Sequence, residues 1–548
     1  MKRANNTEAT SLSRPWRHIG FSAVSVCSLA FLVACGGGGV NREPSKADLN
    51  DTGPRTPTGP GGFKSACAAP AFAGETENDA FKIQQEALRG EFGWLRNWTN
   101  ETYFWSDDVV DVAPTRSNDQ YSYFLDLKTD RRTLSGRNID TIRFSQNTDQ
   151  FRGYRSTELR LGFGLEIVPK ASGASDRYYI SYVTPGSPAA ATDNIEFGLM
   201  RGAQVLSVNG TDVTQNLSLD DRVSLQTSLF PSRLGEKTTF EVMEPGASKS
   251  NTITLTAEKI APKPVGHSEA IATTSGTVGY VLINSFNSAQ SESAVKDAIS
   301  VMADAGISDL VLDLRYNSGG SIAVASQLSF MVAGSSKTAG RAFEQLRFKD
   351  GAGLINPVTG NKNEIIPFYN RGIGLTVEDG TPLPSLDLAR VFILSSTNTC
   401  STSEAVINGL RGVDIKVILI GEGTCGKPFG GYPTDNCGVT YLKTQFQAEN
   451  DRGFGDYLDG FIPENSTARY GVRVPGCEVV DDYQHELGDK REILLKTALS
   501  YRETGKCPAT GNALGTFVGF TDKKANAGLV LSDQADIMHT NRDMHGIK

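Results

Sequence analysis

Histidine is scarce in this sequence, and two short motifs that often mark an active or metal site are missing. Only five histidines occur among 548 residues, and no two cysteines have CxxC spacing. Histidine and closely spaced cysteine thiolates are the usual ligands of zinc. No GxSxG motif is present, so the sharp strand-to-helix turn of the α/β-hydrolases is not predicted. We therefore expect neither a metal site nor a cofactor.

A long apolar run and an excess of positive charge are also absent. Beyond the first forty residues no apolar run reaches the length that a membrane-spanning helix needs. The formal net charge is -8 and the pI is near 5.4, which argues against a general nucleic-acid-binding protein. Hydrophobic residues make up 39% and charged residues 21%, as in globular proteins. A chain of 548 residues predicts several domains.

Residues 1–34 have the pattern of an export signal. Lys2, Arg3, Arg14 and Arg17 precede or flank the start of a short apolar stretch over 19–34. The stretch ends in Leu-Val-Ala-Cys-Gly over 32–36, which resembles a bacterial lipobox. The resemblance implies cleavage before Cys35 and attachment of a lipid to its thiol. An ordinary signal peptide with a chance cysteine is the alternative.

The predicted location is the bacterial cell envelope, with the protein lipid-anchored and periplasmic or on the cell surface. Gly36, where inner-membrane lipoproteins often have aspartate, favours the outer membrane by analogy with sorting rules. Residues 35–77 begin with a Gly/Pro/Asp-rich stretch that contains almost no large apolar side chains. Such a composition cannot bury a core, so we expect a flexible tether.

Six cysteines remain if Cys27 is removed with the signal and Cys35 carries the lipid: Cys67, Cys400, Cys425, Cys437, Cys477 and Cys507. An even number in an exported protein favours disulfides, although six cysteines allow many pairings. Cys425 and Cys437 are separated by a segment rich in proline and glycine, which favours a tight reversal. Our hypothesis is that these two cysteines form a bridge.

The rest of the chain divides into regions of different periodicity. Residues 78–150 begin with a helical pattern rich in aromatics, which predicts a small helical N-terminal subdomain. Residues 155–258 are typical of a mostly-β domain, with a hairpin turn at Asn209-Gly210. Residues 270–507 alternate predicted strands and helices, as in α/β proteins. The tail over 508–548 is left unassigned.

Two turns in the α/β region carry polar residues or glycines directly after predicted buried strands. The strand over 309–314 is followed by Gly319 and Gly320, whose backbone N–H groups could hold an oxyanion. The strand over 391–395 is followed by Ser401, just before a predicted helix. A serine in that place is most often only a helix N-cap, so Ser401 alone does not define an active site.

A third turn, over 421–427, fits both GxGxxG and GxxxxGK and ends at Lys427. Nucleotide binding is one interpretation, but Pro428 stands where a magnesium-binding Ser or Thr would be, and no helix follows. A buried lysine can instead act as a general base, because burial favours its neutral form. Among the histidines, only His485 is a candidate for that role.

Residues 275–450 resemble the C-terminal processing (tail-specific) serine peptidases, which have a Ser/Lys dyad on a Clp/crotonase-like core. Three motifs carry the resemblance in order: Gly279 to Phe286, Asp313 to Gly320, and Ser401-Thr402-Ser403-Glu404 with Gly426-Lys427. The resemblance implies that Ser401 is the nucleophile and Lys427 the base. It also implies that the amide of Gly319 or Gly320 and that of Thr402 hold the oxyanion.

Residues 155–258 resemble the PDZ domain of the same family. Leu161, Gly162, Phe163 and Gly164 resemble its carboxylate-binding loop, and the following strand could pair with a peptide. The resemblance implies that the domain binds the C-terminal tails of polypeptide substrates.

The chain departs from the family pattern in the residue that orients the lysine. Many members have a glutamine four residues after it, where this chain has Gly431. Asp414, Gln445 and Gln447 are candidates to replace that glutamine, and the sequence does not choose among them.

Together these patterns predict an α/β multidomain protein. We expect a Clp/crotonase-like α/β protease core, a mostly-β PDZ domain and a small helical N-terminal subdomain. The predicted function is that of a serine endopeptidase of exported proteins, with polypeptides and the membrane as partners and no nucleic acid. A catalytically inactive peptide-binding lipoprotein is the alternative. The oligomeric state and the natural substrate are not predicted.

Overall fold

The computed structural model describes residues 77–110, 119–149, 151–152, 159–172, 175–190, 198–215, 217–363 and 365–508. The predicted signal peptide, Cys35, Cys67 and nearly all of the predicted tether and tail lie outside these residues. Within the described ranges, no helix is long and apolar enough to cross a membrane.

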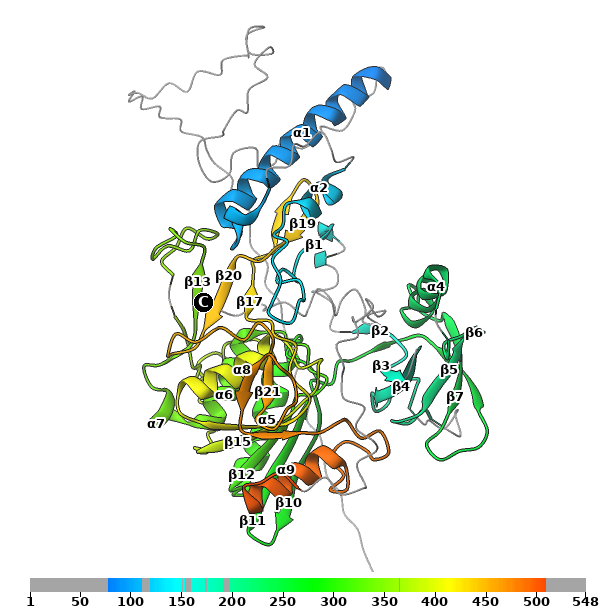
Figure 1. Ribbon diagram of the computed structural model, residues 1–548, viewed down its shortest axis with the longest axis vertical. Coiled ribbons are helices and arrows are strands. Elements are labelled where there is room, and N and C mark those ends of the chain that lie inside the picture. The colour runs from blue at the N-terminus through cyan, green and yellow to red at the C-terminus, as the bar shows by residue number, and fades with distance from the viewer. Residues whose placement is uncertain are drawn as a thin grey trace, which may run out of the picture. The chain divides into compact units, whose positions relative to one another are not determined.

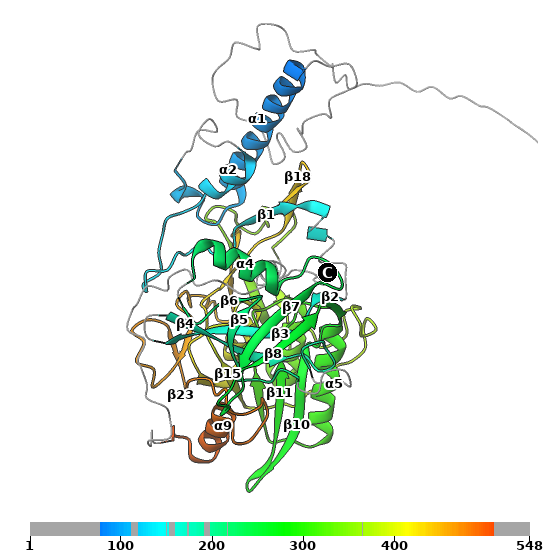
Figure 2. The ribbon, with the colours of Figure 1, turned by 90° about the vertical axis from the view of Figure 1, so that its right-hand side faces the viewer.

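A six-stranded sheet forms the core of the C-terminal region. Its strands, in spatial order, are β10 (Val265–Thr273), β11 (Gly276–Ile283), β12 (Asp309–Asp313), β15 (Arg390–Ser395), β16 (Lys416–Gly421) and β23 (Gly476–Glu478). β10 and β11 form an antiparallel hairpin (Figure 2), and the remaining neighbours are parallel. His267 is part of β10.

Helices cover both faces of this sheet (Figure 1). α5 (Gln290–Asp304), α6 (Ile322–Ala333) and α8 (Thr402–Gly412) pack on one face, and α9 (Ile493–Thr504) packs on the other. β12 is buried along its whole length, as expected of a parallel strand covered on both sides. Because β12, β15 and β16 are parallel neighbours, the turns that follow them meet at one edge of the sheet.

Two smaller sheets lie outside this core, and the sequence did not predict them. One contains β14 (Ile366–Pro367), β13 (Ala342–Phe348), β20 (Phe446–Glu449) and β17 (Phe429–Gly430). The other contains β1 (Phe144–Asn147), β19 (Val439–Leu442) and β18 (Thr434–Asn436). The remaining short elements are α7 (Ser335–Thr338), β21 (Phe461–Pro463) and β22 (Val472–Val474).

The N-terminal region contains the predicted helices, α1 (Glu77–Thr102), η2 (Ser106–Asp108) and α2 (Gln120–Asp126). Its aromatic side chains do not pack only among themselves. Trp94 and Trp98 contact Tyr441, and the ring of Trp105 lies 4.7 Å from that of Phe429. The helices and β1 are therefore joined to the segment that follows Lys427.

Residues 160–260 form the predicted mostly-β domain. Its strands are β2 (Arg160–Gly162), β3 (Leu165–Ser172), β4 (Ser175–Val183), β5 (Gln204–Val208), β6 (Thr211–Asp212), β7 (Lys237–Met243), β8 (Asn251–Thr256) and β9 (Glu258–Ile260), with one described helix, α4 (Leu219–Leu229). Asn209 and Gly210 both have positive φ and join β5 to β6, which confirms the predicted hairpin turn. β3 lies at one edge of the main sheet.

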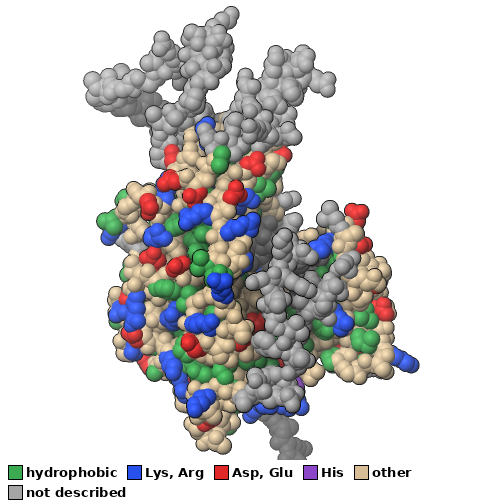
Figure 3. Space-filling model, viewed as in Figure 1, with side chains coloured by type: hydrophobic (Ala, Val, Ile, Leu, Met, Phe, Trp, Pro, Cys, Tyr) green, Lys and Arg blue, Asp and Glu red, His purple; other side chains and the backbone are tan. Residues whose placement is uncertain are grey.

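Basic and acidic side chains are interspersed over the described surface in Figure 3. This distribution on that face agrees with the modest net charge of -8.

Candidate active site

The turns after β12 and β15 lie against each other. The carbonyl oxygen of Asn317 accepts hydrogen bonds from the Cys400 N–H (3.2 Å) and the Ser403 hydroxyl (2.9 Å). Gly319 has φ +125, and a Cβ atom placed on it would lie only 3.1 Å from the Cβ of Ser401. The structure therefore brings the predicted glycine pair next to Ser401.

Ser401 has a backbone conformation that is rare for a residue with a side chain, and its hydroxyl has no hydrogen-bond partner among the described residues. It is fully buried, at the end of the turn that leads into α8, and has φ +52 and ψ -111. Residues other than glycine rarely adopt positive φ, and such strain is common at active sites. The Ser401 Oγ makes no hydrogen bond within the described part of the chain. The residues at the start of α8 have the capping-box arrangement, but the Ser401 Oγ forms no hydrogen bond of ordinary geometry with the helix.

Glu404 joins the serine turn to the lysine turn. Its carboxylate accepts hydrogen bonds from the Ser401 N–H (3.0 Å), the Gly426 N–H (2.7 Å) and the Lys427 N–H (2.8 Å). The Thr424 hydroxyl donates to the same carboxylate at 2.6 Å. Burial raises the pKa of Glu404, and these hydrogen bonds oppose that rise. Lys427 itself is 8% exposed.

The sequence identified Glu404 only as a marker of the serine motif. Its spacing of three residues from a serine at a helix start is that of a capping box, which would explain the bond to the Ser401 N–H. The bonds to the lysine turn connect residues more than twenty positions apart, and no local pattern predicts them.

A disulfide also links the two turns. Cys400, next to the serine, pairs with Cys425, two residues before the lysine, and their Cα atoms are 5.3 Å apart. The predicted Cys425–Cys437 bridge is therefore wrong. The segment between these cysteines forms β17 and β18 rather than a tight reversal, and Cys437 is in a different disulfide. Cys477 pairs with Cys507.

The two glycines after β12 differ in their hydrogen bonding. The Gly319 N–H donates to the side-chain oxygen of Asn317 at 2.9 Å, so it is already engaged. The Gly320 N–H donates to no backbone carbonyl within the residues that the structure describes. The Thr402 hydroxyl donates to the Gly320 carbonyl at 2.8 Å, which places the N-terminal end of α8 beside this glycine.

The three candidates to orient Lys427 have other partners. Asp414 pairs with Arg452 on the surface. Gln445 accepts from the Tyr432 N–H and donates to the Thr102 hydroxyl. Gln447 donates to the Gly455 carbonyl, at 2.9 Å.

His485 lies in the loop between β23 and α9. Its Nδ1 contacts Asp482 at 2.7 Å, and its carbonyl accepts from Arg201. His485 is therefore paired with Asp482 in the same loop.

A buried ion cluster connects the turn after β12 with the mostly-β domain. Arg315, fully buried, pairs with Asp313, Glu492 and Asp481. Arg201 reaches the same Asp481 at 2.8 Å. Burial opposes ionisation of Asp481, but the charges of Arg315 and Arg201 outweigh it and lower its pKa to about 2. Neither Arg201 nor Asp481 was identified as a candidate from sequence.

The four predicted peptide-binding residues lie at the start of the mostly-β domain. Leu161 and Gly162 belong to β2, which pairs with β9. The ring of Phe163 is buried and packs edge-on against Phe240. Gly164, at φ +77, leads into the edge strand β3.

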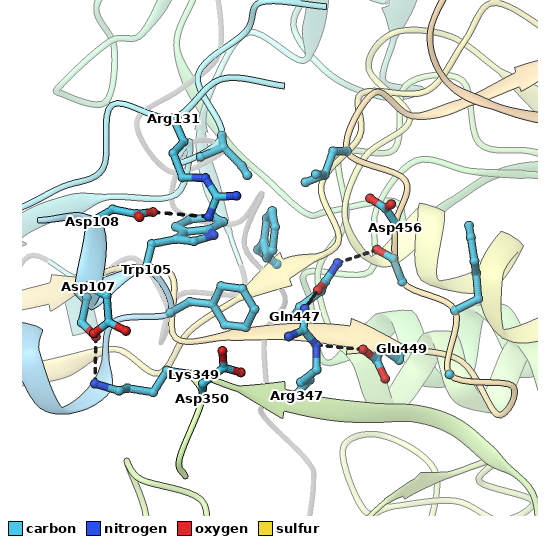
Figure 4. A pocket seen from close by; sticks show the side chains of 18 residues that line it. Trp105, Asp107, Asp108, Arg131, Arg347, Lys349, Asp350, Gln447, Glu449 and Asp456 are labelled. Carbon is cyan, nitrogen blue, oxygen red and sulfur yellow. Dashed lines mark hydrogen bonds and ion pairs between the residues drawn. The ribbon is translucent and has the colours of Figure 1, made fainter. Parts of the chain in front are cut away.

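A cavity of about 530 Å³ lies beside the lysine turn (Figure 4). Its walls come from the N-terminal region, with Trp105 and Arg131, and from β13 and β20, with Arg347 and Gln447. Phe429, two residues after Lys427, also lines it.

The fold defines a class: a multidomain α/β protein with a core sheet of mainly parallel strands and a separate mostly-β domain. Residues 277–435 match the model of peptidase family S41. This region is thus similar to peptidase family S41, and the chain is similar to carboxyl-terminal-processing proteases.

Curated relatives and a solved structure give the extent of the similarity. The carboxyl-terminal-processing protease of Synechocystis sp. is 30% identical over 159 residues, covering 29% of this chain and 34% of that protein. The one of Picosynechococcus sp. is 25% identical over 281 residues, covering 51% and 58%. The chain therefore spans less than two thirds of either relative.

Among solved structures, a Bacteroides fragilis protein assigned to the S41 proteases has 22% identity and a TM-score of 0.55. The match covers 75% of this chain and 97% of that one. This likeness shows the shared fold.

Proposed function

We propose that this protein is a serine endopeptidase that uses Ser401 and Lys427 as a catalytic dyad. One observation carries the proposal. A fully buried serine has a strained backbone and a hydroxyl with no hydrogen bond among the described residues, and it shares the Glu404 carboxylate with the turn that bears Lys427. The similarity to peptidase family S41 supports the same reaction class.

In the proposed mechanism, the neutral Lys427 amine takes the Ser401 proton as Oγ bonds to the scissile carbonyl carbon. Backbone N–H groups of Gly320 and Thr402 hold the oxyanion, with Gly319 as the alternative glycine. The protonated lysine then gives its proton to the leaving amine as the C–N bond breaks. Water attacks the acyl-enzyme, its proton passes to Lys427, and Ser401 recovers a proton when the ester bond breaks.

The substrates that we propose are exported polypeptides recognised by their C-terminal tails. β3 is the edge strand of its sheet, so its outer side can pair with an extended peptide. The segment Leu161, Gly162, Phe163 and Gly164 precedes it and would receive the terminal carboxylate through backbone N–H groups. A lipid on Cys35 would hold the enzyme in the cell envelope, and Cys35→Ala should then release it from membranes.

Cleavage of a peptide by the purified protein tests the dyad. Ser401→Ala and Lys427→Ala should each abolish cleavage, and combining them should cost no more than either alone, because the two residues act as a unit. His485→Gln should retain cleavage. Full activity in either dyad variant would contradict the proposal, and an inactive wild type would favour a peptide-binding protein without catalysis.

A further inference from the structure

A β-turn hairpin of the N-terminal region reaches the lysine turn. Residues 131–139 form this hairpin: the Thr133 N–H donates to the Arg137 carbonyl at 2.8 Å, and the Ile139 N–H donates to the Arg131 carbonyl at 3.1 Å. Ile139 anchors the base of the hairpin in the aromatic cluster that includes Trp105 and Phe429. The tip is thereby fixed relative to the segment that follows Lys427.

At this tip, Arg137 donates to two backbone carbonyls of the peptidase region. Its Nη1 lies 2.5 Å from the Cys425 oxygen, and its Nη2 lies 2.6 Å from the Leu458 oxygen. Asp459 pairs with the same guanidinium at 3.4 Å and accepts from the Ser135 hydroxyl at 2.5 Å. Asp459 thus orients the guanidinium, which donates one hydrogen bond to each of the two carbonyl oxygens.

The Cys425 carbonyl belongs to the peptide bond that directly precedes Gly426. The other end of this peptide, the Gly426 N–H, donates to Glu404 at 2.7 Å. One peptide plane is therefore held at both ends, by Arg137 at its oxygen and by Glu404 at its nitrogen. The next residue along the chain is Lys427.

A peptide plane that precedes glycine needs such contacts. Gly426 has φ +82, and a Cβ atom on it would lie 2.3 Å from the Leu458 oxygen, so a larger residue does not fit. Glycine has wide conformational freedom, and rotation of the plane would withdraw the N–H from Glu404. Such a rotation would also move the backbone from which the Lys427 side chain projects.

We propose that Arg137 is a positioning residue for Lys427, acting through the Cys425–Gly426 peptide. This inference rests on the proposed function, because it assigns Lys427 as the base. Misplacement of a reacting group by about 1 Å can cost about a hundredfold in rate. Arg137→Ala should therefore lower kcat by about tenfold to a hundredfold and leave KM within about twofold.

Arg131→Ala is the matched control. Arg131 lies in the same hairpin and pairs with Asp108 beside the cavity in Figure 4. This substitution removes an exposed arginine from the hairpin but leaves the Arg137 contacts, so kcat should stay within about twofold of wild type. Thermal unfolding of both variants shows whether the fold is intact.

Chemical rescue separates positioning from a loss of structure. Guanidinium added at low millimolar concentration should restore part of the kcat of Arg137→Ala and have no effect on Arg131→Ala. Arg137→Lys, which can serve only one carbonyl well, should have an intermediate kcat.

Three results would overturn the inference: wild-type kcat in Arg137→Ala, an equal loss in Arg131→Ala, or a change in KM alone, which would indicate substrate contact. Each of them needs an active wild type that Ser401→Ala inactivates. If the wild type cleaves nothing, the proposed function itself fails.

Discussion

At the scale of single residues, Glu404 is the side chain on which the geometry of the site depends most. It is fully buried and accepts hydrogen bonds from both the serine turn and the lysine turn. A carboxylate can accept all of these bonds because it has only acceptor atoms.

Glu404→Gln tests this role. The glutamine side chain would point an N–H group at backbone N–H donors, so some of them would lose their acceptor. Leaving buried donors unsatisfied costs about 1–3 kcal/mol each, so we expect a lower free energy of unfolding in urea. Peptide cleavage should fall by about tenfold or more. Wild-type values of both quantities would show that the two turns hold their places without this carboxylate.

The sequence suggested Ser401 and Lys427 as a dyad, which stays a prediction, but not the contacts that hold these residues in place. Both occur in motifs that can be read locally, one before a helix and one after a buried strand. Glu404, Arg137 and Cys400 have partners distant in sequence. The contacts of Glu404 and Cys400 form only once β15 and β16 are neighbours, and those of Arg137 only once the N-terminal hairpin packs against the lysine turn. The choice of oxyanion glycine likewise depends on the bond between the Gly319 N–H and the Asn317 side chain.

At the scale of elements, the disulfide that joins the turns after β15 and β16 should affect the rate of peptide cleavage. The Cys400–Cys425 disulfide connects the residue before Ser401 with a residue two positions before Lys427. Reduction should therefore lower peptide cleavage under conditions in which the protein stays folded, because the lysine turn would lose one attachment.

Variants identify which bridge is responsible. The double variant Cys400→Ala and Cys425→Ala should show the lower activity without reductant, and it should no longer respond to reductant. Replacing Cys477 and Cys507, which tie β23 to the end of α9, should affect thermal stability more than the cleavage rate. A double variant at Cys400 and Cys425 with full activity would rule out this role.

A second element-scale prediction concerns acid. The folded-state pKa of Asp481, about 2, lies below its ordinary value of 3.8, so its contribution to stability is present above pH 4. That contribution, about 2 kcal/mol, should be lost as pH falls from about 4 to about 2. Urea unfolding of wild type and of Asp481→Asn across this pH range measures this contribution to the free energy of unfolding. Identical pH dependence in the two proteins would contradict the assignment.

Elements with a local signal were predicted well, and those formed by distant pairing were not. α5, α6, α8 and the central strands β11, β12, β15 and β16 were predicted from their apolar segments, whereas β10 and β23 were not. β13 and β20 pair residues about one hundred positions apart, as in Gln345 with Glu449, and their short strands leave little periodicity. β1 was missed for the same reason, because it pairs with β19.

At the scale of the whole molecule, the mostly-β domain and the α/β core share one ion cluster. Arg201 of the domain, with a side chain only 2% exposed, and Arg315 of the core contact the same carboxylate, Asp481. Removing one partner of a buried ion pair usually costs about 3–5 kcal/mol. The two regions are therefore expected to unfold together.

Recognition of substrate tails is the corresponding prediction for function. Two peptides with the same internal sequence, one with a free and one with an amidated C-terminus, should be cleaved at different rates. The free peptide should have the lower KM, because backbone N–H groups near Gly164 would bind its carboxylate. Equal KM values would remove the PDZ-type domain from the recognition step.

The most direct test of the account is to trap the acyl-enzyme. The purified protein is mixed with an ester substrate that deacylates slowly, quenched in acid and mapped by mass spectrometry. We predict one acyl group on the peptide that contains Ser401, absent in Ser401→Ala and formed far more slowly in Lys427→Ala. An acyl group on another residue, or equally fast acylation in Lys427→Ala, would contradict the Ser401/Lys427 dyad.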